Sequence, residues 1–178
     1  MALPGLVSRI LHERLKRFEV IITGTPMRLD RGRFDQKFDD YERALQFLAY
    51  ANDAILVVLD SDDDDPHELA YGLEKRALEI VGHRSVRVAP AVMEFEAWFL
   101  ASLPELQGMG DVASDATCET NPESFSGAKG QFAKRLTTGR YSETVDQRKY
   151  AGLMDLAAAE RRSASFAGLL RSIDEVTS

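Results

Sequence analysis

A run of acidic residues follows an apolar stretch near the middle of the chain. The sequence ILVVLDSDDDDP covers residues 55–66 and places Asp60 and Asp62 directly after five consecutive apolar residues. An ionised carboxylate at the end of a buried strand is costly unless it is paired or bound to a cation. Oxygen ligands of this kind suit Mg²⁺ or Mn²⁺ rather than zinc. We therefore predict a divalent-cation site at Asp60 and Asp62, with a solvated Asp-rich turn as the alternative.

The end of the same run has a structural explanation. Asp65 precedes Pro66, and Glu68 stands three residues after Asp65, which is close to the capping-box pattern of a helix start. We predict that Asp65 and Glu68 cap a helix rather than bind a metal, and that His67 is exposed in its first turn. The glycine and glutamate that an EF-hand loop requires at its sixth and twelfth positions are missing.

A third carboxylate comes from the segment MEFEAWFLA, residues 93–101, which carries three aromatic residues on one helical face. On a helix Glu94 and Glu96 lie about 200° apart, so they cannot both face one site. Glu96 falls on the apolar side, and we predict that it points into the core, where it joins a metal near Asp60. The alternative partner for Glu96 is a backbone amide or an arginine. Glu94 is explained by a cap or a dipole contact at the helix start.

The charge of the chain is unevenly distributed. The formal net charge is −7 and the isoelectric point is about 5.0, which argues against a purely electrostatic DNA binder but not against a nuclease with an acidic metal site. Residues 126–162 contain eight lysines and arginines and four acidic residues. An acidic site beside a basic segment suits phosphate chemistry, and an ordinary helix surface is the alternative.

The length and composition of the chain indicate the class of protein. A chain of 178 residues fits one domain that can bury a core without cross-links. Its single cysteine, Cys118, excludes an internal disulfide and a cysteine-based zinc site. No segment reaches the ~18 consecutive apolar residues of a membrane helix, and no signal-peptide pattern opens the sequence. We expect a cytoplasmic protein without a membrane partner.

The elements that must position these residues alternate along the first part of the chain. Hydrophobic periodicity and β-rich runs predict helices over residues 3–18, 34–51, 66–82 and 94–103, and strands over residues 18–23, 54–60 and 85–92. Strands separated by helices indicate a parallel sheet with right-handed crossovers. Ligands in such folds bind at the carboxyl ends of the strands, which is where Asp60 stands.

The second part of the chain is predicted to be less regular. Residues 103–125 contain Pro, Gly and Ser without periodicity and are predicted to form a loop. Helices are expected within residues 126–136, 148–162 and 165–176. We therefore expect an α/β core over residues 1–102 and, over residues 103–178, a loop and a helical C-terminal extension that packs on the core as one structural unit.

Five segments carry a resemblance to a known family. In chain order they are ILVVLDSDDDDP, EFEAWFLA, AKGQFAKRL, GRYSETVDQ and RRSASFAGL. Together they resemble the TOPRIM-like domain-of-unknown-function family 4276, which is related in fold to the topoisomerase–primase domains of overcoming-lysogenization-defect-type nucleases. The resemblance covers nearly the whole chain. It implies a Rossmann-like parallel sheet of three to four strands flanked by helices, and a Mg²⁺- or Mn²⁺-dependent nuclease or phosphotransfer activity on nucleic acid. It also implies a role in phage defence beside an ATPase partner protein.

The resemblance assigns roles residue by residue. Asp60 and Asp62 match the Asp-x-Asp metal pair, and Glu96 matches the glutamate of a Phe-Glu-x-Trp-like helix in related nucleases. These three residues are therefore expected to be both catalytic and metal-binding. Candidate nucleic-acid contacts come from the Ala-Lys-Gly and Gly-Arg-Tyr-Ser stretches, and they are Lys129, Arg140 and Tyr141.

The beginning of the chain departs from the family pattern. Family members usually open with a strand that ends in Val-Glu-Gly just before Ala-Leu-Pro, and its glutamate acts as general acid/base or as a metal-side carboxylate. This sequence begins MALPG, so we expect that strand to be absent, through a late start or a shortened form. Strand 18–23 would then pair directly with strand 54–60, or another chain would fill the gap.

Two alternatives to the enzyme follow. The missing glutamate and the acidic surface favour a catalytically inactive interaction or regulatory subunit of an ATPase-containing system, and a homo-oligomer would fill the gap in the sheet. A small-molecule or nucleotide-binding α/β protein is the third hypothesis. The lack of a Gly-rich phosphate loop after any predicted strand counts against it.

Overall fold

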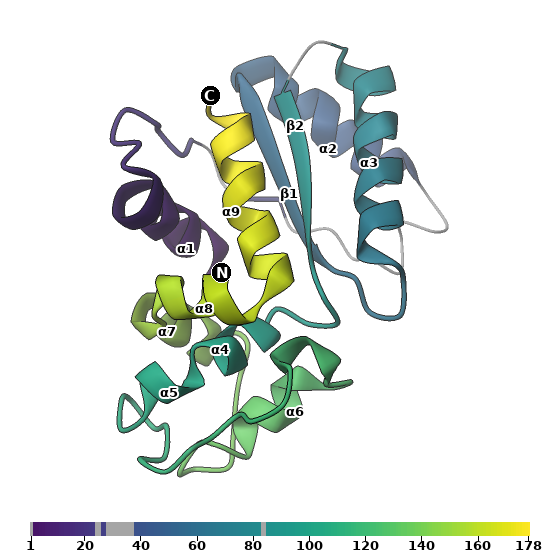
Figure 1. Ribbon diagram of the computed structural model, residues 1–178. Helices are drawn as coiled ribbons and strands as arrows, with labels where there is room; N and C mark the ends of the chain where they lie inside the picture. The colour runs from purple at the N-terminus through teal and green to yellow at the C-terminus, as the bar shows by residue number, and fades with distance from the viewer. Residues whose placement is uncertain (1, 24–25, 28–37, 83–84) are drawn as a thin grey trace.

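Two parallel strands form the centre of the molecule. The computed structural model describes residues 2–23, 26–27, 38–82 and 85–178. Strands β1 (Ala54–Asp60) and β2 (Ser85–Ala91) pair in parallel, with Ala54 opposite Ser85 and Asp60 opposite Ala91. Their carboxyl ends point toward the part of the molecule that contains α4 (Ala97–Ala101) and α6 (Ala128–Ala133) (Figure 1). Both strands were predicted from their apolar, β-branched composition, and the prediction is confirmed.

The helix that connects the two strands begins where the sequence predicts. Helix α3 (Pro66–Val81) has Asp65 at its N-cap. Asp65 Oδ1 accepts hydrogen bonds from the backbone N–H groups of His67 and Glu68, at 2.9 and 3.0 Å. These bonds satisfy two of the donors that a helix start leaves free. Asp65 is therefore confirmed as a capping residue.

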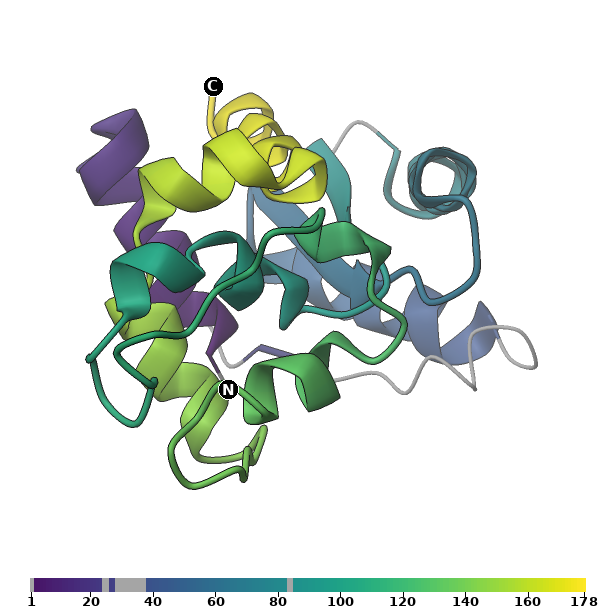
Figure 2. The same ribbon diagram turned by 60° about the horizontal axis from the view of Figure 1, so that its bottom comes forward.

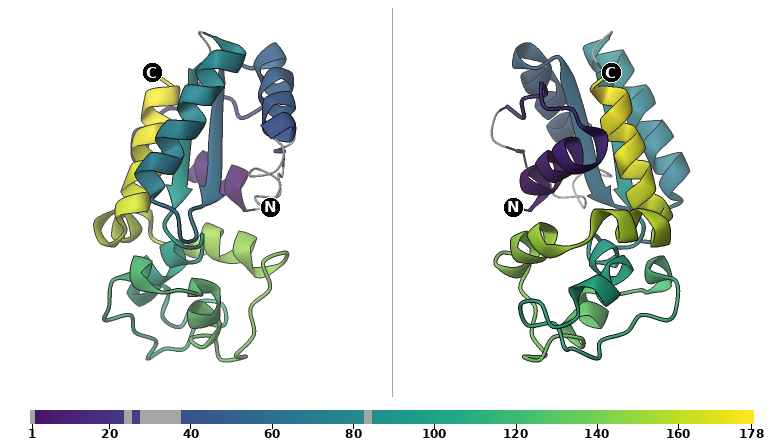
Figure 3. Two further views of the ribbon diagram at one scale, coloured as in Figure 1. Left: turned by 90° about the vertical axis from the view of Figure 1, so that its right-hand side faces the viewer. Right: turned by 60° about the vertical axis from the view of Figure 1, so that its left-hand side comes forward.

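The two faces of the sheet bury different sets of side chains. Ile55, Val86 and Val88 pack with α2 (Phe38–Ala51) and α3 in one cluster. The alternate residues, which include Val58 and Ala89, pack in a larger cluster that contains α9 (Ala164–Val176). This alternation is the period of two that a strand imposes on its side chains. The sheet accordingly lies between α9 on one side and α2 on the other (Figure 3).

The remaining helices are short, and most of them gather beyond the carboxyl ends of the strands (Figure 2). They are α1 (Leu3–Arg9), the π-helix η1 (Ile10–Leu15), α4 (Ala97–Ala101), α5 (Leu103–Leu106), the 3₁₀ helix η3 (Pro122–Ser124), α6 (Ala128–Ala133), α7 (Asp146–Leu153) and α8 (Leu156–Arg162). Their core is aromatic: Trp98, Phe99, Phe132 and Phe166 are fully buried. The ring centroids of Trp98 and Phe166 lie 5.4 Å apart in an edge-to-face arrangement.

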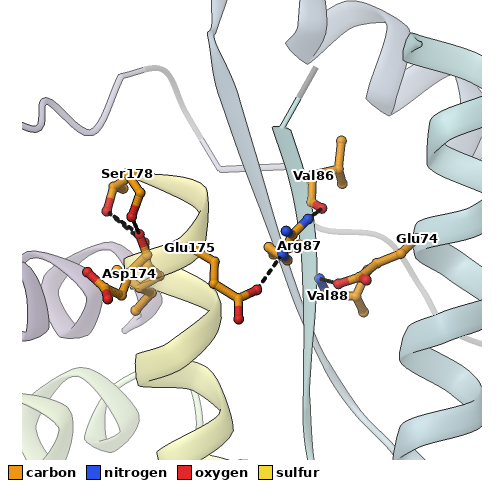
Figure 4. A network of polar contacts seen from close by, with 9 residues as sticks. Glu74, Val86, Arg87, Val88, Asp174, Glu175 and Ser178 are labelled. Carbon is orange, nitrogen blue, oxygen red and sulfur yellow. Dashed lines mark hydrogen bonds and ion pairs between the residues drawn. The ribbon is translucent and has the colours of Figure 1, made fainter. Parts of the chain in front are cut away.

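The last helix returns to the sheet. Helix α9 packs on β2, and Arg87 Nε of β2 lies 2.7 Å from Glu175 Oε2 of α9. On the other side, Glu74 Oε1 of α3 accepts the backbone N–H of Val88 at 2.8 Å (Figure 4). Side chains from two helices thus hold β2 in place, and the C-terminal segment is part of the packing of the sheet.

The predicted strand over residues 18–23 is wrong, because these residues form a turn and irregular backbone. Their β-rich composition does not bury them: Phe18 is 69% exposed and Ile21 is 80% exposed. β-propensity describes how a side chain fits a paired, half-buried surface, and it forms no strand without a partner. Within the residues described, the sheet therefore has two strands instead of the three to four expected. The beginning of the predicted helix 34–51 lies outside these residues.

None of the helices described combines the length and the apolar character that a membrane span requires.

Candidate functional site

The site is built where the chain leaves the two strands. Asp60 is the last residue of β1 and lies opposite Ala91, on the face of the sheet that packs against α9. The backbone N–H of Ser61 donates to the carbonyl of Ala91 at 2.8 Å. Asp60 Oδ1 accepts the backbone N–H of Phe95 at 2.8 Å. The segment after β2 is thus fastened to the segment after β1 by the side chain of Asp60.

The two segments cross at Asp62 and Met93. The N–H of Asp62 donates to the carbonyl of Met93 at 3.3 Å, and the N–H of Met93 donates to Ser61 Oγ at 3.1 Å. Asp62 has a φ of 47° and Met93 a φ of 61°, both in the left-handed region. That region costs a residue other than glycine about 1–2 kcal/mol. Backbone of this kind clusters at functional sites, where the surroundings hold it in place.

Four carboxylates share this edge of the sheet. The pKa of Asp60 is raised to about 6, first by burial and then by the negative charges of Glu96, Asp62 and Glu94, while the hydrogen bond from Phe95 opposes the shift. A carboxyl group in such surroundings is stabilised in its ionised form when a cation lies beside it. A cation beside Asp60 would therefore oppose the effect of burial on its pKa.

Glu96 is buried, as predicted from the helical wheel, with 3% of its surface exposed. Its partner is neither a backbone amide of another residue nor an arginine, the two alternatives considered for it. Glu96 Oε1 accepts a hydrogen bond from the Tyr141 hydroxyl at 2.7 Å and a longer one from Gln147 Nε2 at 3.4 Å. Burial raises the pKa of Glu96, and the hydrogen bond from Tyr141 opposes this shift.

Glu94 does not cap its own helix. Its Oε2 atom accepts the backbone N–H of Lys129 at 2.7 Å, at the start of α6. Helix α4 begins only at Ala97 and has no side-chain cap. Glu94 therefore joins the segment after β2 to the C-terminal half of the chain, a contact that spans 35 residues and has no local signal in the sequence.

The three predicted nucleic-acid contacts have different surroundings. The ammonium group of Lys129 forms an ion pair with Glu143, and the hydroxyl of Tyr141 is bound to Glu96. Burial, followed by the charge of Glu96, raises the pKa of Tyr141, so its phenol stays protonated. Arg140 is exposed and forms no ion pair with any residue that the structure describes. Of the three, Arg140 has the side chain that is free to meet a phosphate.

The donor chemistry of the site fits a hard cation, since every candidate ligand is a carboxylate oxygen. The candidate ligands are Asp60, Asp62 and Glu96. Across residues 2–23, 26–27, 38–82 and 85–178, no three His, Cys, Asp or Glu side chains already converge as a metal-binding group. Mg²⁺ does not need such a cage, because it commonly keeps several waters and is held by one or two carboxylates and substrate phosphates.

Sequence reasoning missed two residues of the site. Gln147 donates to Glu96 from 51 positions away in the sequence. The hydroxyl of Ser61 accepts the backbone N–H of Met93. The one signal for Gln147 is its place as the last residue of the stretch GRYSETVDQ, which also contains Tyr141. Ser61 gave no signal, because a serine between aspartates is typical of any polar turn.

Comparisons with known proteins place the chain in a family. No curated protein and no solved structure matches it significantly. The family model described as Domain of unknown function (DUF4276) matches residues 1–174. Since this match covers nearly the whole sequence, the protein belongs to the DUF4276 family.

Proposed function

We propose that the protein is a TOPRIM-like enzyme of phosphodiester chemistry, a nuclease or phosphotransfer protein that depends on Mg²⁺ or Mn²⁺. The observation that supports this most is the environment of Asp60. Its carboxyl lies at the ligand-binding edge of a parallel sheet, and its pKa is raised to about 6 by burial and by three neighbouring carboxylates. Perturbed carboxyl groups of this kind occur preferentially at functional sites.

Each residue of the site has a role in this proposal. Asp60, Asp62 and Glu96 hold the cation, directly or through water. A bound cation would polarise the phosphodiester and lower the pKa of an attacking water. Arg140 binds a phosphate oxygen and fixes the register of the nucleic acid without reading its sequence. A role in phage defence beside an ATPase partner is part of the same proposal and rests on the resemblance to TOPRIM proteins.

The test combines metal binding with activity. Thermal unfolding is measured in EDTA, Mg²⁺ and Mn²⁺ for the parent, for Asp60→Asn and for Asp65→Asn. A cation that binds only the folded state raises the midpoint. We expect Mn²⁺ to raise the thermal midpoint of the parent and of Asp65→Asn, because the Asp65 carboxylate only caps α3. We expect no such rise for Asp60→Asn.

Activity is then followed on single- and double-stranded DNA and RNA. Cleavage by the parent in Mn²⁺, lost in EDTA and in Asp60→Asn, is the expected result. Cleavage that survives in Asp60→Asn would show that the site lies elsewhere. No response to either metal would remove the metal-dependent proposal.

A second candidate function has its own observation. Phe18 and Ile21 are exposed in a segment that forms no strand, and this segment borders a cavity of about 490 Å³ beside α1. Val20, Ile21 and Ile22 line this cavity side by side, and contiguous exposed apolar surface marks interaction sites. A non-catalytic subunit would bind its partner through this surface. Sedimentation velocity, which compares the oligomeric state of the parent with that of Ile21→Ser, tests this function. An assembly that dissociates in the variant supports this function, and an unchanged monomer argues against it.

A further inference from the structure

Two side chains from the C-terminal half of the chain form hydrogen bonds with the same carboxylate oxygen of the acidic site. The Tyr141 hydroxyl and Gln147 Nε2 both donate to Glu96 Oε1, at 2.7 and 3.4 Å. Tyr141 precedes α7, and Gln147 lies in its first turn. Neither residue is near Glu96 in the sequence, so the fold alone brings them to it.

The two donors compensate for the hydration that the Glu96 carboxylate loses on burial. Glu96 is 3% exposed, and an ionised carboxylate without water is unfavourable unless hydrogen bonds replace the lost hydration. Tyr141 and Gln147 both donate to Oε1, and the backbone N–H of Glu96 itself gives the carboxylate a further hydrogen bond. Partners of this kind fix the orientation of a carboxylate that ligates a metal, and their loss typically weakens metal binding about 10- to 100-fold.

We propose that Tyr141 and Gln147 are positioning residues that hold the Glu96 carboxylate in place for a divalent cation. This inference rests on the proposed function. It replaces the expectation that Tyr141 contacts phosphate, since its hydroxyl proton is already donated to Glu96. Tyr141 thus acts through Glu96 and does not touch the substrate.

The test measures Mn²⁺ affinity by calorimetry for the parent, Tyr141→Phe and a matched control. Phenylalanine keeps the ring, which packs edge-to-face against Phe132 with centroids 5.6 Å apart, and removes only the donor. The control is Tyr41→Phe, because the Tyr41 hydroxyl donates to the carbonyl of Leu73 at 3.2 Å in the other hydrophobic cluster.

We expect Tyr141→Phe to weaken Mn²⁺ binding about tenfold or more, and Tyr41→Phe to bind within about twofold of the parent. Gln147→Leu should weaken it less, because its hydrogen bond is longer. A double-mutant cycle of Tyr141→Phe with Glu96→Gln, measured by urea unfolding in EDTA, reports the contact itself. A purely structural contact would show coupling in this cycle and leave the Mn²⁺ affinity unchanged.

The outcomes separate the inference from the function on which it rests. If the parent binds Mn²⁺ through Asp60 and Tyr141→Phe binds equally well, the positioning role is overturned and the proposed function stands. Tighter binding by Tyr141→Phe would also overturn it, because the hydroxyl would then compete with the cation. If the parent binds no Mn²⁺, both fall together.

Discussion

At the scale of single residues, Asp60 makes stability depend on pH. Its pKa is 3.8 in its ordinary state and about 6 in the folded protein, so between these values the folded state binds more protons than the unfolded state. The contribution of Asp60 to the free energy of unfolding therefore falls as the pH rises from about 4 to above 6. We predict that, in EDTA at pH 7.5, Asp60→Asn is more stable than the parent by up to about 3 kcal/mol.

Urea unfolding at pH 7.5 and at pH 4 checks this prediction, because the difference should vanish at pH 4, where the folded carboxyl is protonated. Asp65 affects the pH dependence of stability in the opposite direction. Hydrogen bonds from Glu68 and His67 lower its pKa, so Asp65→Asn should lose stability at neutral pH. A parent that is more stable than Asp60→Asn in EDTA would contradict a net destabilising effect of burial on the ionised Asp60 carboxylate.

The residues of the site show how far sequence reasoning extends. The location of Asp60 could be predicted because a buried strand must end somewhere, and polar residues mark that end. The burial of Glu96 followed from the helical spacing of the aromatic residues around it, although α4 begins only at Ala97. The hydrogen bond from Tyr141 to Glu96 could not be predicted, because it depends on how the C-terminal half packs, and no local pattern encodes such a contact.

At the scale of elements, the cap of α3 gives a direct prediction. Asp65 satisfies two backbone donors at the start of a 16-residue helix. Asp65→Ala should lower the free energy of unfolding by about 1 kcal/mol, measured in urea at pH 7. Mn²⁺ should still raise its thermal midpoint as in the parent, because the side chain is occupied at the helix. Loss of the Mn²⁺ response in this variant would mean that Asp65 is a ligand.

The crossing of the two segments gives another prediction at this scale. Met93 has a φ of 61°, where glycine carries no steric penalty. We predict that Met93→Gly is more stable than Met93→Ala by about 1 kcal/mol in urea unfolding. The matched pair is Lys75→Gly and Lys75→Ala in α3, where glycine should be the less stable by about 1 kcal/mol. The same sign at both positions would show that Met93 does not hold a left-handed backbone.

The elements themselves were predictable to the extent that their signals are local. Both strands and the start of α3 follow from apolar runs and a capping pattern. Residues 18–23 show the same β-rich composition and form no strand. A strand requires an edge to pair with, and the availability of that edge is decided by the rest of the fold.

At the scale of the whole molecule, the larger of the two hydrophobic clusters joins the two parts of the sequence. The larger cluster contains Leu6 near the N-terminus, Ala89 of β2, Trp98 of α4 and Phe166 of α9. The expected division at residue 102 therefore separates segments that share this core. A small single domain commonly unfolds in a single transition, so we expect secondary structure and the surroundings of Trp98 to be lost together.

Phe166→Ala tests whether the two parts of the chain unfold in a single transition. The ring is fully buried against Trp98, so its removal should cost about 3–5 kcal/mol. Because Trp98 is the single tryptophan and packs against Phe166, its fluorescence reports how the C-terminal helices pack around α4, while far-UV circular dichroism reports the whole chain. We expect both urea midpoints to fall equally, and Phe47→Ala, at a 71% exposed position, to change them by less than about 0.5 kcal/mol. A fluorescence midpoint that falls alone would mean that the C-terminal half unfolds independently of the sheet, and that Tyr141 and Gln147 can leave Glu96 while Asp60 stays in place.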